Sequence, residues 1–248
     1  MKILQVTAVD FTVKKFLLPL VNDLESKNYE VHIACDVNEI GQQLRSEGYE
    51  IKHIPFSRDF NLISHLKALI KLISLIKTEK YDIIHSHTPV ASLISRLAAK
   101  ITNVPLNVYT AHGFYFHENM KPIVYKITYG IEKVWSKFFT DYLFFQSKED
   151  YELAINNKFN KPDRLIHINN GVSGEKFNPK YYNESLIRQS LNLQEKKVIL
   201  FVGRLVEEKG IKELLSAFEM LSSRHDDLSL LLVGGELLET EMDFRLKK

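Results

Sequence analysis

The segment 201–210 combines a glycine with two spaced cations in a way that suits a diphosphate ligand. An apolar run ends just before Gly203, and Arg204 and Lys209 follow it. A glycine at a strand end lets the backbone approach an anion, and the start of the next helix adds a partial positive charge. Arginine and lysine add charge-assisted hydrogen bonds. We therefore predict that Gly203, Arg204 and Lys209 bind a diphosphate group.

Small and hydrogen-bonding residues follow five of the predicted strands at their carboxyl ends. In open parallel sheets, ligands bind beyond these ends. We interpret the residues as a polar rim that faces a substrate cleft, although a coil can also collect such residues by chance. The candidates for substrate contact are Asp10, His87, Gly113, Ser147, Asn170 and Gly171.

Four of the nine histidines lie near two of these strand ends: His85, His87, His112 and His117. Such a cluster first suggests a metal site, but no cysteine or carboxylate completes a known ligand spacing and no Asp-x-Asp motif occurs. We therefore expect no metal. Two interpretations stay open: the histidines are structural, or His112 contacts a sugar or phosphate where Gly113 keeps the approach free.

Aromatic residues follow His112 in the segment 110–118 and alternate with lysines in the segment 121–139. Aromatic rings beside a polar group bind the faces of sugars, but such clusters more often pack a core. Lysines interleaved with aromatics are typical of a helix in a membrane interface, and also of an ordinary amphipathic helix with solvated lysines. Both alternatives stay open for each segment.

The composition is that of a globular chain with almost balanced charge. The 248 residues include 33 Lys and Arg and 31 Asp and Glu, so we expect no nucleic-acid partner and only local anion sites. The single cysteine, Cys35, excludes an internal disulfide and fits a reducing compartment. Asp10 interrupts the apolar start before a signal peptide can form, and no charge-free segment is long enough to span a bilayer. We expect a cytoplasmic protein, with peripheral contact to the inner face of the membrane as an option.

Three common motifs of other enzyme classes are absent. The first βα turn, Val6 to Thr12, has no glycine where a dinucleotide pyrophosphate would approach, which argues against hydride transfer. The sequence also contains neither a Gly-x-Ser-x-Gly elbow nor a Walker-type loop.

Short apolar runs alternate with segments of helical period, which predicts an α/β fold with a parallel sheet built from βαβ units. We expect strands near residues 2–7, 30–35, 50–54, 82–85, 106–110, 141–145 and 165–168, with helices between them. Apolar residues at three- and four-residue spacing predict core-facing stripes on two of these helices. The stripes are Phe16, Leu17, Leu20, Val21 and Leu24 on the first helix, and Leu62, Leu66, Leu69, Ile70, Ile73 and Ile76 on the second.

The sequence predicts a division into three parts. Residues 1–172 form a Rossmann-like domain, the polar segment 173–197 connects it to the next, and residues 198–248 begin a second domain. This last part holds a strand at 198–202, a helix at 211–223 and a strand at 228–233. A βαβ unit of about 50 residues is barely large enough for a core of its own. We expect this unit to pack against the first domain or to be mobile. Residues 236–248 should form a short helix or a loose tail.

These motifs, in this order, resemble those of bacterial GT-B glycosyltransferases of family 4, in particular enzymes of capsular and exopolysaccharide synthesis. The resemblance covers essentially the whole chain. Its most specific motif is Val-Gly-Arg-Leu-Val-Glu-Glu-Lys-Gly, which starts at Val202. The others are Val-Thr-Ala-Val-Asp-Phe-Thr from Val6, Ile-His-Ser-His-Thr-Pro from Ile84, Tyr-Thr-Ala-His-Gly-Phe-Tyr-Phe-His-Glu from Tyr109, Phe-Gln-Ser-Lys-Glu-Asp from Phe145 and Ile-Asn-Asn-Gly-Val from Ile168.

The resemblance implies two facing Rossmann-like domains, a complete N-terminal one for the acceptor and an incomplete second one for a nucleotide-sugar donor. It implies retention of anomeric configuration, with no metal and no cofactor besides the nucleotide-sugar co-substrate. Arg204 and Lys209 match the pair that binds the donor diphosphate. His112 matches the catalytic histidine that reaches the donor sugar.

The chain departs from the family pattern in two places. Asn170 and Gly171 match an Asn-Gly pair before the interdomain connection, but Ser173 stands where aspartate is usual. Family members also carry two glutamates seven residues apart in the far half of the second domain, and this sequence ends before that region. Glu239 and Glu241 have a different spacing. We therefore expect a truncated donor domain.

The resemblance favours a glycosyltransferase that moves a sugar from a nucleotide-sugar to a lipid-linked or saccharide acceptor in surface polysaccharide synthesis. One alternative is an inactive truncated remnant, or one half of a split enzyme that a separate chain completes. A second alternative is a sugar-binding or membrane-associated interaction module.

Overall fold

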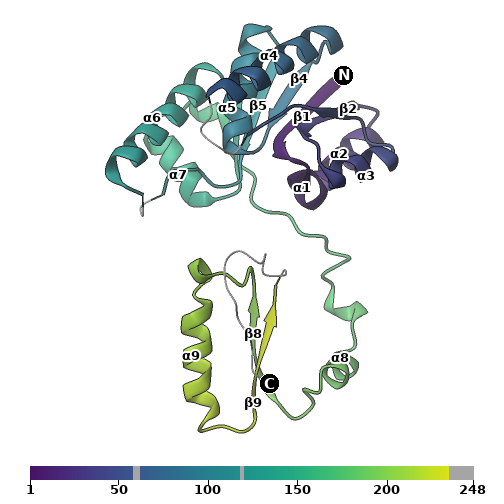
Figure 1. Cartoon of the computed structure of the whole chain (residues 1–248), viewed down its shortest axis with the longest axis vertical. Coiled ribbons are helices and arrows are strands. Elements are labelled where there is room, and N and C mark those ends of the chain that lie inside the picture. Colours follow the sequence, from purple (N-terminus) through teal and green to yellow (C-terminus); the bar gives the residue numbers. More distant parts are fainter. Residues whose placement is uncertain (58–61, 118–119, 235–248) are drawn as a thin grey trace. The chain divides into compact units, whose positions relative to one another are not determined.

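A computed structural model describes residues 1–57, 62–117 and 120–234 of the chain (Figure 1). The chain forms two compact units, which divide between Gly171 and Val172. Each unit is described by itself below.

The first unit is built on one seven-stranded parallel sheet with the order β3-β2-β1-β4-β5-β6-β7. The order reverses direction between β1 and β4, and open α/β sheets bind ligands at such a switch point. The strands are β1 (Lys2–Val9), β2 (Glu30–Asp36), β3 (Ile51–His53), β4 (Ile83–Ser86), β5 (Leu106–Ala111), β6 (Tyr142–Phe145) and β7 (Leu165–His167).

Helices connect the strands of this sheet (Figure 1). After β1 the chain passes through α1 (Asp10–Thr12), a π-helical turn η1 (Val13–Leu17) and α2 (Leu18–Ser26). The later helices are α3 (Glu39–Ser46), α4 (Leu62–Glu79), α5 (Pro89–Ile101), α6 (Pro122–Phe138) and α7 (Lys148–Asn156), with a 3-10 turn η2 (Pro162–Arg164) before β7.

Three apolar clusters hold the unit together. Leu4, Val6 and Ile84 pack against α4 and α5, while Val31 and Ile33 pack with η1, α2 and α3. A third cluster joins β5, β6 and β7 to α7 and to the aromatic residues of α6. Alternate residues of β2 enter different clusters, so the strand contributes apolar side chains to both of its faces, as expected for a central parallel strand.

The seven predicted strands are all confirmed, but the two helical stripes are only partly right. In the first stripe Leu17 and Val21 are buried, whereas Phe16 is 63% exposed. Phe16 lies in η1, whose π-helical turn shifts the helical phase. In the second stripe Ile76 is buried, while exposed positions include Leu62, Leu66 and Ile70. On α4 the buried positions include Ala68 and Leu72, so the core face is rotated from the predicted one.

The second unit contains one βαβ motif. Strands β8 (Lys197–Val202) and β9 (Leu228–Val233) pair in parallel, with α9 (Ile211–Ser222) between them, as predicted. The polar connection also holds a 3-10 turn η3 (Pro179–Tyr181) and a short helix α8 (Glu184–Ser190), and η4 (Glu207–Lys209) precedes α9. Among the described residues after Gly171, only Ile211 is buried. This part of the chain thus has almost no core of its own, which fits an incomplete second domain.

The boundary of the two compact units lies one residue before the end of the first predicted part, and the finer three-part division stays a prediction. The predicted tail over 236–248, with Glu239 and Glu241, lies outside the described residues. Among the helices of the described ranges, none combines the length and the apolar character needed to cross a membrane.

Candidate functional site

Three of the four clustered histidines lie at the carboxyl ends of β4 and β5, next to the switch point between β1 and β4, whereas His117 is exposed in the loop after β5. His87 directly follows β4, and its backbone N–H donates to the carbonyl of Val6 on β1 at 2.9 Å. His112 directly follows β5, the next strand across the sheet. The strand order therefore brings together two of the predicted site residues, which are 25 positions apart.

A chain of four side chains runs through this site from the buried sheet to the surface. His87 Nε2 lies 2.8 Å from Gln5 Oε1, and His87 Nδ1 lies 3.1 Å from His112 Nε2. His112 Nδ1 in turn lies 2.8 Å from Gln146 Oε1. Gln5 and His87 are almost completely buried, at 1% and 2% exposure, whereas His112 is exposed.

The surrounding protein lowers the pKa of three histidines of the site, which favours their neutral forms. Burial lowers the pKa of His85 to about 3, with a smaller contribution from His112. Burial likewise holds the pKa of His87 well below its ordinary value. Desolvation on the partly buried inner side of His112 lowers its pKa as well, although the hydrogen bond to Gln146 acts in the opposite direction. His85 bonds Thr110 through Nε2 at 2.7 Å, and its ring lies 4.2 Å from that of His87. The site therefore offers neutral imidazoles that donate or accept hydrogen bonds.

The loop after β5 is held by its own backbone and by α7. Gly113 has φ of +120°, a left-handed conformation that side-chain-bearing residues rarely adopt. The next backbone N–H, of Phe114, donates to Asp150 Oδ2 at 3.0 Å. Ser147 caps α7, since its Oγ accepts from the Asp150 N–H at 3.3 Å. Gly113 and Ser147 thus support the position of His112, and their direct contact with substrate stays a prediction.

Asp10 has a structural role that the sequence did not reveal. Its Oδ2 accepts the backbone N–H groups of Asn38 and Gly41 at 2.7 and 2.8 Å, at the start of α3. The side chain is buried, with 4% exposure. A carboxylate at this place satisfies free helical N–H groups and complements the helix dipole. Its predicted contact with substrate stays untested.

Asn170 and Gly171 lie in the exposed coil after β7, at the end of the first unit. The preceding Asn169 has φ of +58°, while the sterically open surroundings of Gly171 leave room for a side chain. Their role in ligand binding stays a prediction.

The predicted diphosphate segment joins β8 to α9 in the second unit. Gly203 follows β8 and donates its N–H to the Val233 carbonyl at 2.9 Å, and Arg204 and Lys209 are exposed. Gly210 has φ of +71° between η4 and α9. Gly234 was not a candidate from sequence, yet a Cβ there would overlap the Gly203 carbonyl oxygen. A glycine is therefore required where β9 ends against this loop.

Sequence reasoning also missed two residues near His112. Gln5 lies inside β1 in an apolar run, and only the strand order places it against His87. Phe16 was assigned to the core, but its exposed ring lies 6.5 Å from the His112 ring. In the described parts of the chain, no group of three His, Cys, Asp or Glu side chains can hold a metal ion.

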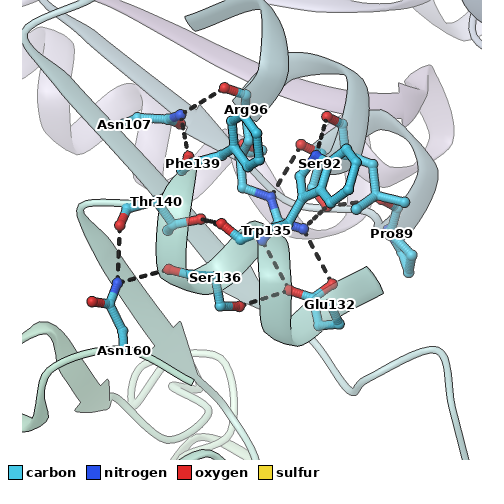
Figure 2. Close-up of polar contacts among 12 residues, drawn as sticks. Pro89, Ser92, Arg96, Asn107, Glu132, Trp135, Ser136, Phe139, Thr140 and Asn160 are labelled. Carbon is cyan, nitrogen blue, oxygen red and sulfur yellow. Dashed lines mark hydrogen bonds and ion pairs between the residues drawn. The ribbon is translucent and has the colours of Figure 1, made fainter. Parts of the chain in front are cut away.

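A buried ion pair joins α6 to α5, as Figure 2 shows. Arg96 is 0% exposed and donates to Glu132 Oε1 and Oε2 at 2.8 and 3.1 Å. Ser136 donates to the same carboxylate at 3.0 Å, and Trp135 Nε1 donates to the Leu93 carbonyl at 2.9 Å.

The aromatics of α6 therefore face inward rather than toward a membrane interface. Tyr125 and Tyr129 pack on Phe116, and Trp135 bonds α5. Phe138 is the exception, with 59% exposure. The lysine and aromatic mixture of this segment is thus largely the pattern of a packed amphipathic helix.

The fold is α/β of the GT-B type, with a first unit built on a seven-stranded parallel sheet and a second unit that contains one βαβ motif. Residues 2–147 match the family model "Glycosyl transferase 4-like", and residues 183–248 match "Glycosyl transferases group 1". The chain belongs to the glycosyl transferase 4-like family.

Curated relatives come from capsule and lipid-linked sugar synthesis. The chain is 36% identical to the Staphylococcus aureus capsular polysaccharide biosynthesis glycosyltransferase CapM, over 88% of this chain and 57% of the relative. It is 28% identical to the Escherichia coli UDP-Gal:alpha-D-GlcNAc-diphosphoundecaprenol alpha-1,3-galactosyltransferase, over 91% and 60%. The chain thus spans about three fifths of the length of these relatives.

Solved structures share the fold. A Rickettsia africae glycosyltransferase superimposes with a TM-score of 0.71 and 21% identity, over 94% of this chain and 60% of the other. Anabaena HepE in complex with UDP and glucose gives a TM-score of 0.68 and 18% identity, over 96% and 62%.

Proposed function

We propose that this chain supplies the acceptor domain and the diphosphate-binding part of the donor domain of a retaining glycosyltransferase. The reaction would transfer a sugar from a nucleotide-sugar to a lipid-linked or saccharide acceptor in surface polysaccharide synthesis. The observation that carries the proposal is the segment between β8 and α9, in which Gly203, Arg204 and Lys209 follow a parallel strand. The names of the relatives from Staphylococcus and Escherichia point to the same reaction class.

The expected affinity for a nucleoside diphosphate is low. Two charge-assisted contacts of roughly 1.5–3 kcal/mol each and a helix dipole of up to about 1 kcal/mol give a Kd near or somewhat below millimolar before ordering costs. Titration of UDP into the ¹⁵N-labelled chain should shift the resonances of the segment 203–211. Arg204→Ala or Lys209→Ala should each weaken binding roughly 10- to 100-fold.

Arg224→Ala is the matched control, because Arg224 is an exposed cation beyond the other end of α9. Equal binding by all three variants would refute the assigned diphosphate site. Transfer is then assayed with a panel of UDP-sugars and undecaprenyl-diphosphate-linked N-acetylglucosamine, and the anomer of the product is read by NMR. An inverted anomer would refute retention.

An exposed apolar face on α6 supports peripheral contact with an anionic membrane. Aliphatic residues at helical spacing, together with Phe138, point away from the core: Ile123, Val124, Ile127, Ile131, Val134 and Phe138. Lys126 and Lys137 are exposed on the same helix, and its single acid, Glu132, is buried against Arg96. The exposed part of α6 is therefore apolar and cationic, which suits the boundary of an anionic bilayer.

An apolar hollow of about 130 Å³ lies beside this helix, lined by residues that include Val90, Leu93, Phe116 and Ile131. It is suited to a hydrocarbon segment of a lipid-linked acceptor.

Flotation with vesicles containing phosphatidylglycerol tests the membrane contact. Each lysine near an anionic surface is worth about 1 kcal/mol, so Lys126→Glu with Lys133→Glu should weaken binding at least about 30-fold. The control is Lys67→Glu with Lys71→Glu, two exposed lysines on α4. Unchanged vesicle binding by the α6 variant, or a loss of vesicle binding in the α4 variant alone, would refute the proposed membrane contact of α6.

A second candidate follows from the length of the relatives, of which this chain spans about three fifths: turnover requires residues of the remaining two fifths. In that case the chain acts only together with a further polypeptide segment, or is catalytically inactive. UDP binding without sugar transfer favours this candidate. Transfer by the purified chain alone excludes it.

A further inference from the structure

The chain Gln5–His87–His112–Gln146 constrains where each proton can sit. Both ring nitrogens of His87 and both of His112 lie within hydrogen-bond distance of a partner. A neutral imidazole has one N–H and one lone pair, so the direction of one bond fixes the direction of the next. Only two arrangements satisfy the contact between the two histidines.

In the first arrangement protons point inward. His112 Nε2–H donates to His87 Nδ1, and His87 Nε2–H donates to Gln5 Oε1, so His112 Nδ1 is an acceptor. The amide nitrogen of Gln5 then has no partner, although it is buried. In the second arrangement all directions reverse. The Gln5 amide is turned, so that its nitrogen donates to His87 Nε2. His87 Nδ1–H then donates to His112 Nε2, and His112 Nδ1–H donates to Gln146 Oε1.

The second arrangement is favoured because it removes an unpaired donor from the buried end of the chain. A buried N–H without a partner is rarer in proteins than an under-satisfied carbonyl oxygen. The orientation of a glutamine amide is assigned from its hydrogen bonds, so turning Gln5 costs nothing in the positions of the other atoms. The contact of His112 Nδ1 with Gln146 Oε1 is then a hydrogen bond without any change at Gln146.

We propose that His87 is a positioning residue that holds His112 as the Nδ1–H tautomer, with its donor nitrogen on the exposed side. The outer bond to Gln146 is the exposed one, whereas the inner bond to His87 is partly buried. A sugar hydroxyl or oxygen would thus replace Gln146 and accept a hydrogen bond from His112 Nδ1–H. This role toward the sugar rests on the proposed function, but the tautomer itself does not.

Long-range ¹H–¹⁵N NMR of the ¹⁵N-labelled full chain tests the proposal without substrate, because protonated and unprotonated ring nitrogens differ widely in ¹⁵N shift. The signals of His112 are assigned with His112→Gln. We expect a protonated Nδ1 and an unprotonated Nε2 in His112. The opposite pattern in the wild-type chain would overturn the proposal.

Three variants separate positioning from a merely structural effect. His87→Phe removes the inner donor and should shift His112 toward the Nε2–H tautomer. His87→Asn keeps an amide N–H near the former Nδ1 and should restore the wild-type pattern, so it also serves if the phenylalanine variant does not fold. Gln146→Met removes only the outer partner and should leave the tautomer unchanged.

A tautomer that responds to Gln146→Met but not to His87→Phe would overturn the assignment of His87. If the NMR results are as expected but His112→Gln transfers sugar at the wild-type rate, then the positioning stands and the proposed function of His112 fails.

Discussion

Replacing Glu132 should destabilise the first unit more than any replacement of an exposed charge. Glu132→Ala leaves the guanidinium of Arg96, which is 0% exposed, without its bidentate acceptor. It also removes the acceptor of the Ser136 hydroxyl. Breaking a buried ion pair from one side costs about 3–5 kcal/mol, a large part of the roughly 5–15 kcal/mol that stabilises an ordinary domain.

The double variant Arg96→Met with Glu132→Met should cost less than Glu132→Ala. It removes both charges together and fills the space with apolar atoms, a change that is often close to neutral. A double-mutant cycle of Arg96→Met, Glu132→Met and the double variant should therefore give a coupling energy of at least about 2 kcal/mol. Glu152→Ala is the control: its pair with Lys148 is 3.6 Å long and exposed, so it should cost less than about 1 kcal/mol.

The chain contains its own probe for this measurement. Trp135 is the only tryptophan, and its Nε1 donates to the Leu93 carbonyl across the same interface. Urea unfolding followed by tryptophan fluorescence thus reports on the packing of α6, and circular dichroism checks that helices unfold in the same transition. A cost below about 1 kcal/mol for Glu132→Ala, or no coupling to Arg96, would refute this reasoning.

Three further predictions concern the sheet edge and the core. Because burial keeps the pKa of His85 at about 3 and that of His87 well below about 6.5, the unfolded chain takes up protons that the folded one does not. The free energy of unfolding should therefore be highest above a pH of about 6.5 and should fall as the pH drops toward about 3. In His85→Gln the midpoint of urea unfolding should depend less on pH in this range. Burial raises the pKa of the Cys35 thiol to about 12, so a thiol reagent at neutral pH should label Cys35 in urea but not in the native chain. Gly113→Ala should cost about 1–3 kcal/mol in urea unfolding because of its φ of +120°.

Each of these predictions has a result that contradicts it. A pH profile of His85→Gln that parallels the wild type would exclude this histidine as the source of acid sensitivity. Rapid labelling of native Cys35 would show that its burial is not maintained in solution. For Gly113, the control is Gly130→Ala inside α6, which has open surroundings and should stabilise by up to about 1 kcal/mol; a similar gain at Gly113 would contradict the positive φ.

The strands and the βαβ motif after residue 196 were predictable from sequence because their signals are local. An apolar run such as Val198 to Val202 specifies an extended segment wherever it lies in the fold, although in this strand Leu200 and Val202 are exposed. The glycine and the two cations that follow lie within the same short segment, and their binding of a diphosphate stays a prediction. The exposure of Phe16 was not predictable, since a single π-helical turn changes which residues of the following helix face the core.

Only the tertiary structure decided which side chains meet. Gln5 and His87 are 82 positions apart, and Arg96 and Glu132 are 36 apart. Such contacts depend on strand order and register. Both are set by the packing of all the helices and strands together, so no local sequence pattern predicts them. The inward rotation of the α6 aromatics has the same origin, because the buried ion pair fixes the face of the helix. The sequence alone thus determined the elements and the chemistry available at their ends, while the packing determined the hydrogen-bonded chain that leads to His112.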